Sequence, residues 1–114
     1  MTHDDVLTEL GRTLAARRSA DPSTSYTASL LAGGDVEILK KVGEEATEVI
    51  LAGSGETNEA LVHEVADLWF HTLVLLAHRG LGPDDVLAEL ARRSGISGHE
   101  EKAARGATPR SEGD

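Results

Sequence analysis

The sequence predicts an all-α fold: an antiparallel helical hairpin with flanking helices, whose four-helix-bundle-like core is completed by dimerisation. Apolar residues recur at helical spacing, and no segment gives a convincing strand pattern. Residues 58–79 are apolar on almost all sides, and a hairpin in a chain of 114 residues cannot cover such a helix. We therefore expect a single all-helical domain over residues 1–94 and an obligate homodimer.

Two helices are expected before the hairpin. The first spans residues 4–18, because leucine and valine recur on one face and arginines close the segment. The polar stretch SADPSTS then acts as a linker, with Pro22 as a stop signal. A short helix from about Tyr26 to Ala32 ends at two glycines, and Asp35 is expected to cap the next helix.

Residues 35–52 form the first helix of the hairpin and carry acids beside an apolar stripe. At 100° per residue, Glu45 falls about 20° from Ile38, which places it inside that stripe. Glu48 lies on the edge of the stripe, whereas Glu44 points about 100° away from Glu45. Glu45 and Glu48 are therefore the expected inward pair.

The second helix of the hairpin, residues 58–79, contains one polar line in an otherwise apolar sequence. Glu64, Asp67 and His71 stand at i, i+3 and i+7, which places them on one face. The predicted turn, residues 53–57, is short enough to make the two helices antiparallel neighbours.

The carboxylates of the two helices are expected to pair level by level. At about 1.5 Å rise per residue, Glu48 lies roughly 7 Å from its end of the turn and Glu64 roughly 9 Å. Glu45 and Asp67 lie roughly 12 and 13 Å away on the same scale. Four acids should therefore meet between the helices.

A last helix is expected from Gly82-Pro83-Asp84-Asp85 to about Arg93, with proline and acids in its first turn. From Ser94 the composition shifts to small and charged residues. Residues 95–114 are therefore expected to form a separate C-terminal segment, in which roughly the last ten residues are disordered.

Four ionised carboxylates in one partly dry pocket repel each other, and a hard divalent cation relieves that repulsion. Mg²⁺ is the expected ion, with Mn²⁺ possible, since both prefer oxygen ligands. Zinc or iron is disfavoured, because the chain has no cysteine and only His71 on the polar line. The alternative is a structural network in which Lys40, Lys41 and Arg79 neutralise the acids.

The net charge of -9 and the lack of a basic patch argue against nucleic acid or an anionic membrane as a partner. No segment is expected to be apolar for long enough to span a bilayer, and the acidic N-terminus does not resemble a signal peptide. The absence of cysteine is compatible with a reducing compartment. We expect a cytoplasmic protein.

The stretches SYTASLLAGGDVEILKKVGEEATEVILA, EVADLWFHTLVLLAHRGLGPDDVLAEL and SGISGHEEKAAR resemble the phosphoribosyl-ATP pyrophosphohydrolase family of histidine biosynthesis. The likeness runs from about Ser25 to about Arg105. The acidic motifs, EExxE and ExxD, are shared with the wider all-helical MazG-type nucleotide pyrophosphohydrolases. The segments SYTASLLAGG and KKVGEEATE narrow the resemblance to the phosphoribosyl-ATP pyrophosphohydrolase family.

This resemblance implies hydrolysis of the anhydride between the alpha and beta phosphates of phosphoribosyl-ATP by a Mg²⁺-activated water, releasing phosphoribosyl-AMP and pyrophosphate. It also implies a dimer. The expected ligands are Glu45, Glu48, Glu64 and Asp67. A spare carboxylate, Glu44 or Glu48, could orient the water or accept its proton, and the sequence does not divide these roles.

Other side chains are candidates for contact with the substrate. Lys41, beside the Glu45 stripe, is favoured for a phosphate role over Lys40. Ser25 and Tyr26 could bind substrate or cap the short helix. Lys102 belongs to the C-terminal segment, which either folds over the substrate or remains a solvated tail. His71 is either a partner of the metal-binding carboxylates or a satisfied core histidine.

Three functions remain open on the sequence alone. The first is phosphoribosyl-ATP pyrophosphohydrolase. The second is a MazG-type house-cleaning enzyme that hydrolyses ordinary or damaged nucleoside triphosphates with the same four acids. The third is a non-catalytic helical dimerisation module whose acids form a structural network.

Overall fold

A computed structural model describes residues 2–95 of the chain. In chain order it contains α1 (His3–Arg17), the 3₁₀ turn η1 (Pro22–Thr24), α2 (Tyr26–Gly55), α3 (Asn58–His78) and α4 (Pro83–Ser94). Residues 2–95 contain no strand. The predicted all-α class is therefore confirmed.

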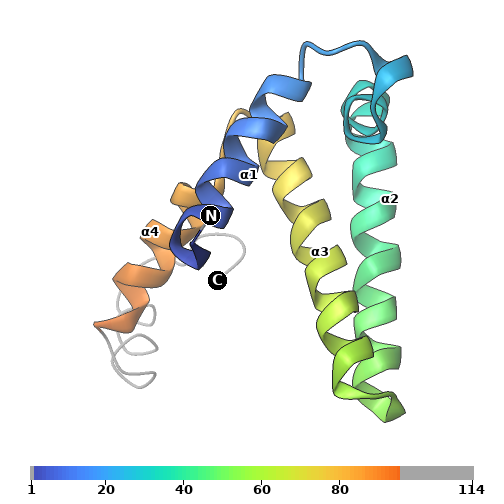
Figure 1. Ribbon diagram of the computed structural model, residues 1–114, viewed down its shortest axis with the longest axis vertical. Coiled ribbons are helices and arrows are strands. Elements are labelled where there is room, and N and C mark those ends of the chain that lie inside the picture. The colour runs from blue at the N-terminus through green and yellow to red at the C-terminus, as the bar shows by residue number, and fades with distance from the viewer. Residues whose placement is uncertain (1, 96–114) are drawn as a thin grey trace, which may run out of the picture. The chain divides into compact units, whose positions relative to one another are not determined.

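Helices α2 and α3 lie side by side and run in opposite directions, which confirms the predicted hairpin (Figure 1). The chain falls into two compact units, Met1–Pro83 and Asp84–Asp114. The first unit holds α1, α2 and α3, and therefore the whole hairpin. The proposed single domain over residues 1–94 stays a prediction.

The core of the first unit joins its three helices through one fully buried side chain from each. Leu14 of α1, Ile38 of α2 and Val74 of α3 are at most 2% exposed. Full burial of such a side chain stabilises a fold by about 1.5–3 kcal/mol, so these contacts hold the hairpin together. Other buried apolar side chains extend the same cluster: Leu30, Leu31, Leu73 and Ala77.

Helix α2 consists of two helices joined at a kink, as the sequence predicted. Gly34 interrupts it with φ 74° and ψ -164°, a conformation open almost only to glycine. The expected break at the two glycines is thus real but one residue wide. Ser25 caps the start of α2 by accepting a hydrogen bond from the Ala28 N–H at 3.3 Å.

Asp35, which was predicted to cap a new helix, instead pairs across the hairpin. Its Oδ1 lies 3.1 Å from Nε2 of His78, near the end of α3. This contact ties the segment just after the kink to the neighbouring helix. The His78 side chain is half-buried, with 31% of its surface exposed.

The turn between α2 and α3 is shorter than predicted. Helix α2 continues to Gly55, and α3 begins at Asn58 after only Glu56 and Thr57. The Glu56 N–H donates to the Ala52 carbonyl at 3.2 Å, and Thr57 Oγ1 accepts from the Ala60 N–H at 3.1 Å. These capping bonds satisfy backbone groups at both helix ends, so a two-residue connection suffices.

The predicted first helix and linker need small corrections. Helix α1 spans His3–Arg17 instead of residues 4–18, a difference within the usual fraying of helix ends. The linker contains the turn η1, which Asp21 caps by accepting from the Ser23 N–H at 2.9 Å. This backbone bond, with a second one from the Ser23 hydroxyl, lowers the pKa of the Asp21 carboxyl.

Helix α3 was expected to be too apolar for one chain to cover, and the described residues of a single chain do leave part of it exposed. His71, Leu73, Val74 and Ala77 are buried, all in its second half. Val62 is 68% exposed and Trp69 is 58% exposed. One apolar face of α3 is therefore left uncovered by the described residues of a single chain.

Helix α3 is also long and apolar enough, by length and composition, to cross a membrane. The expectation that no segment reaches that length is therefore wrong. Core helices of soluble proteins pass the same test, and α3 carries Glu64, Asp67 and His71 on a single face. Its extensive packing against α2 is that of a hairpin helix.

Helix α4 was correctly predicted to begin at the proline and to carry acids in its first turn. Glu89 lies between two arginines, with its carboxylate 3.0–3.1 Å from Arg92 Nε and 3.3 Å from Arg93 Nε. The hydrogen bond from Arg92 is the largest cause that holds the pKa of Glu89 down at about 2. These pairs stabilise the exposed face of the helix.

Replacing Gly34 by alanine is expected to lower the free energy of unfolding by about 1–3 kcal/mol, because an L side chain is strained in this conformation. Gly43→Ala is the matched control. Gly43 is helical with open space around it, so alanine should stabilise by about 0.5–1 kcal/mol. Urea unfolding measures both changes, and equal shifts of the same sign would contradict the assignment of the kink.

Candidate metal centre

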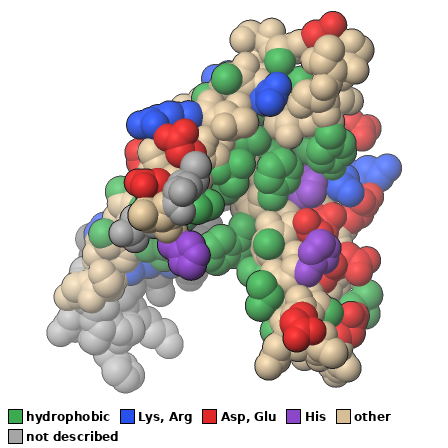
Figure 2. Space-filling model, viewed as in Figure 1, with side chains coloured by type: hydrophobic (Ala, Val, Ile, Leu, Met, Phe, Trp, Pro, Cys, Tyr) green, Lys and Arg blue, Asp and Glu red, His purple; other side chains and the backbone are tan. Residues whose placement is uncertain are grey.

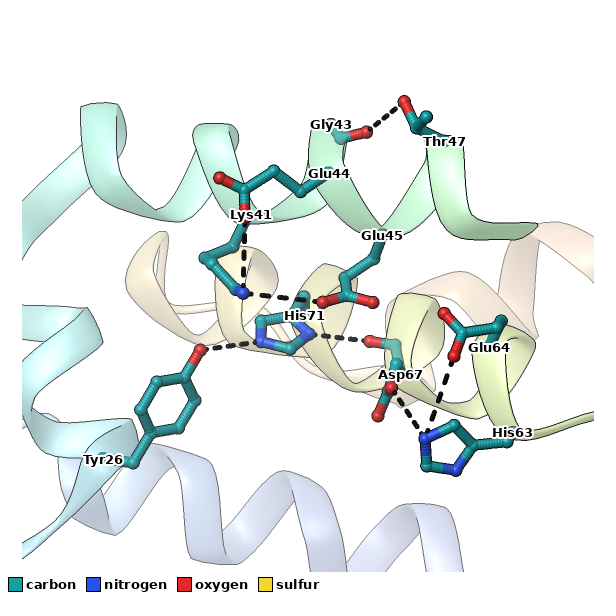
Figure 3. A network of polar contacts seen from close by, with 10 residues as sticks. All are labelled: Tyr26, Lys41, Gly43, Glu44, Glu45, Thr47, His63, Glu64, Asp67 and His71. Atoms are coloured by element: carbon teal, nitrogen blue, oxygen red, sulfur yellow. Dashed lines mark hydrogen bonds and ion pairs between the residues drawn. The ribbon is translucent and has the colours of Figure 1, made fainter. Parts of the chain in front are cut away.

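The predicted site residues come together on the facing surfaces of α2 and α3. Figure 3 shows Lys41 and Glu45 projecting from α2 towards His71 and Asp67 on α3, while Glu44 lies along α2 beside Lys41. In the space-filling view, acidic side chains and histidines gather over the same hairpin (Figure 2). The hairpin core thus positions a row of titratable groups along one side of two packed helices.

Glu45 points between the helices, as its angle on the helical wheel predicted. Its side chain is 13% exposed, whereas that of Glu44 is 48% exposed. Lys41 Nζ lies 3.5 Å from Glu45 Oε1 and 3.4 Å from Glu44 Oε2. One ammonium group therefore pairs with both carboxylates and offsets one of their two negative charges, which is part of the structural network that the sequence left open.

Glu64 is the point at which the four acids meet electrostatically. Burial raises the pKa of its carboxyl, and the negative charges of Glu48, Asp67 and Glu45 raise it further, against the opposing effect of His63. A carboxylate responds in this way only when the other three are close enough to repel it. The negative charges of Glu48, Asp67 and Glu45 therefore act on Glu64, while the pairing of the acids level by level stays a prediction.

His63 joins this cluster from the surface, since its side chain is 71% exposed. Its Nε2 lies 3.3 Å from Asp67 Oδ2 and 3.9 Å from Glu64 Oε1. His63, Glu64 and Asp67 each offer one ligand atom, and these atoms lie within 4.8 Å of one another. The i, i+4 spacing of His63 and Asp67 is the sequence signal that could have found the contact.

His71 is buried, at 6% exposure, and is held by two hydrogen bonds. Its Nδ1 lies 2.7 Å from the backbone carbonyl of Asp67, and its Nε2 lies 3.0 Å from the Tyr26 hydroxyl. Phe70 and Tyr26 meet the ring edge-on, with centroids at 5.2 and 6.1 Å. The residue is therefore a satisfied core histidine that also contacts an expected ligand residue through its backbone.

The other predicted residues occupy varied positions. Glu48 was expected to point inward with Glu45, but it is exposed on α2, because it lies at the edge of the apolar stripe. Lys40 is also exposed on α2. Ser25 is half-buried, and its Oγ is engaged in capping. Burial lowers the pKa of Lys41, but Tyr26, Glu44 and Glu45 together outweigh that effect and raise it, so the side chain is an ammonium at neutral pH. Lys102 lies outside the described residues.

Carboxylate oxygens dominate the ligand atoms that this arrangement offers. Hard divalent ions such as Mg²⁺ prefer such ligands, and a divalent charge would cancel the repulsion that raises the pKa of Glu64. The site can therefore bind a divalent cation and, through it, an anionic substrate. Lys41 adds one further positive charge at the same level.

Comparison with known proteins agrees with this chemistry. A family model for phosphoribosyl-ATP pyrophosphohydrolase matches residues 7–94. The chain is 54% identical over 106 residues to the phosphoribosyl-ATP pyrophosphatase of Hydrogenovibrio crunogenus, which covers 90% of this chain and 94% of that protein. It is 57% identical over 102 residues to the enzyme of the same name from Geobacter sulfurreducens, with 90% and 94% covered.

Both the family match and the relatives extend over the acid-bearing hairpin and over most of the chain. The resemblance first suggested by the SYTASLLAGG and KKVGEEATE segments is therefore confirmed. The chain belongs to the phosphoribosyl-ATP pyrophosphohydrolase family, the enzymes of one step of histidine biosynthesis.

Proposed function

We propose that this protein hydrolyses phosphoribosyl-ATP to phosphoribosyl-AMP and pyrophosphate, with Mg²⁺ held by Glu45, Glu48, Glu64 and Asp67. The observation that carries the proposal is the convergence of the four acidic charges at Glu64, in a chain of this family. The house-cleaning reading loses support, because the relatives named above are phosphoribosyl-ATP pyrophosphatases.

The residues present fit a divalent cation. Carboxylates from two antiparallel helices face one another, and their mutual repulsion is the cost that a cation would remove. Mn²⁺, which accepts the same ligand types, is expected to substitute. When bound, such an ion supplies positive charge for the phosphate oxygens and lowers the pKa of a water molecule.

The remaining groups suit the chemistry around the phosphates. Lys41 is a permanent cation next to Glu45 and is proposed to contact the phosphates on substrate binding. Glu44 and Glu48 are exposed carboxylates on the same helix, and one of them is proposed to orient the attacking water and accept its proton. Lys40 and Ser25 are weaker candidates for substrate contact. Lys102, in the C-terminal segment, is also still proposed to contact the substrate.

We also propose a homodimer in the cytoplasm. Val62 and Trp69 of α3 are exposed, and so are Ile50 and Leu51 of α2, at 67% and 55%. Large exposed apolar side chains on one hairpin are typical of an interface between subunits. A second hairpin would cover them and complete a four-helix core.

Glu45→Gln and Asp67→Asn are each expected to lower kcat for pyrophosphate release from phosphoribosyl-ATP by about 100-fold or more, because each removes a ligand charge. Glu59→Gln is the matched control, since Glu59 is an exposed acid in the first turn of α3. ATP and dCTP are assayed in parallel. Faster release from these triphosphates than from phosphoribosyl-ATP would favour the house-cleaning activity. Full activity of both variants would contradict the proposed metal site.

Glu64→Gln separates a metal site from a structural network. The folded state raises the pKa of Glu64, so its contribution to stability is present below the ordinary pKa of 4.5 and is lost as pH rises through the folded value. Without metal, Glu64→Gln should therefore melt higher than wild type at pH 7, with the gap closing towards pH 4.

Adding Mg²⁺ at pH 7 should raise the melting temperature of the wild type and have little effect on Glu64→Gln. Thermal unfolding with and without EDTA measures both arms. A structural network predicts the opposite: no response of the wild type to Mg²⁺, whatever the pH.

Sedimentation equilibrium should give twice the 12.0 kDa chain mass for the wild type. Val62→Lys places a charge on the exposed apolar face of α3 and should shift the protein to monomers at micromolar concentration. Glu59→Gln makes the same change in net charge at a polar position and should leave the mass unchanged. A monomeric wild type would refute the dimer.

A further inference from the structure

The hydrogen bonds at His71 determine the direction of the Tyr26 hydroxyl. Nδ1 of His71 faces the Asp67 carbonyl at 2.7 Å, and a carbonyl can only accept, so Nδ1 carries the proton. In the neutral imidazole the other nitrogen then has a lone pair. At 3.0 Å from that nitrogen, the Tyr26 hydroxyl is the donor.

A hydroxyl that already donates its proton in one hydrogen bond can only accept hydrogen bonds from other partners. Tyr26 is 57% exposed, so part of the side chain remains open to a ligand while its proton is held by the buried His71. Phosphate and carboxylate oxygens offer no hydrogen and gain nothing from such a group. A ligand hydroxyl or amino group does, because it donates.

The position of Tyr26 in the polar row agrees with this chemistry. Figure 3 shows Tyr26 at one end of the row and Glu64 with His63 at the other, with Lys41 and His71 between. A cation held by the acids, together with the Lys41 ammonium, would supply positive charge to the phosphates of a triphosphate. Tyr26 lies beyond Lys41, on the side away from Glu64, where a part of the substrate other than the phosphates would lie.

We propose that Tyr26 is a specificity-determining residue that accepts a hydrogen bond from a hydroxyl or amino group in the sugar or base part of the substrate. His71 is the positioning residue that fixes its direction. The inference rests on the proposed function and narrows the sequence-based expectation, which gave Tyr26 no defined partner. It also orients the substrate along the hairpin, with the phosphates towards Glu64 and the nucleoside towards Tyr26.

Tyr26→Phe tests this directly, because it removes one oxygen from an exposed side chain and keeps the ring. Binding is measured by calorimetry at fixed Mg²⁺ with two probes, phosphoribosyl-AMP and pyrophosphate. The Kd of phosphoribosyl-AMP should rise about three- to tenfold, which corresponds to the binding free energy usually lost with one hydrogen bond. The Kd of pyrophosphate should stay the same. In turnover the variant should raise KM by a similar factor.

Ser54→Ala is the control, since it removes a hydroxyl that bonds to the Ile50 carbonyl near the other end of α2. It should leave the Kd of both probes unchanged. AMP and inosine monophosphate then distinguish the sources of the donor. An effect of Tyr26→Phe on AMP alone assigns the amino group, and an equal effect on both assigns a sugar hydroxyl.

A parallel rise in the Kd of pyrophosphate would overturn the proposal, because Tyr26 would then act on phosphate or on the whole site. Unchanged binding of both probes would overturn it as well and leave the Tyr26–His71 bond as structure. These outcomes concern binding alone. Failure of the wild type to release pyrophosphate from phosphoribosyl-ATP would instead refute the proposed function, so the two failures are distinguishable.

Discussion

The apolar contact between α2 and α3 is the constraint on which the acidic site depends. The fully buried Ile38 and Val74 hold α2 and α3 together. Glu45 stands seven residues after Ile38, and Asp67 stands seven residues before Val74, about 10 Å along each antiparallel helix. The apolar contact at one level therefore forces the acids together at another, where Lys41 and His63 relieve part of the repulsion.

The sequence could predict the fold and the inward direction of Glu45 because both follow from helical periodicity, but Glu48, which was expected to point inward with it, is exposed. The direction of Glu45 needed only its angle to Ile38, and the meeting of the acids at Glu64 needed only an antiparallel turn. The length of that turn was less predictable. Gly53, Ser54 and Gly55 have low helix propensity, yet they extend α2, because the Ser54 hydroxyl bonds to the Ile50 carbonyl and Thr57 caps the next helix.

Helical periodicity could not predict which side chains of different helices contact each other. The pairing of Asp35 with His78 joins residues that are far apart in sequence, and the bond of Tyr26 to His71 spans 45 positions. Neither has a periodic signature. Helical spacing also could not say how much of α3 one chain would cover, since the same apolar sequence suits a core, a subunit interface and a membrane. Only the family comparison and the acidic face decide among these readings.

The two-residue connection between α2 and α3 sets the register of the acids. Loops usually tolerate insertions, because they lie on the surface and pack little. Here an added residue at Glu56 or Thr57 would have to be absorbed without moving Glu64 along α3 relative to Glu48. The segment before Tyr26 does not set the register of the acids. Insertions and deletions within this fold should therefore occur in that segment, whereas the connection between α2 and α3 should keep its length.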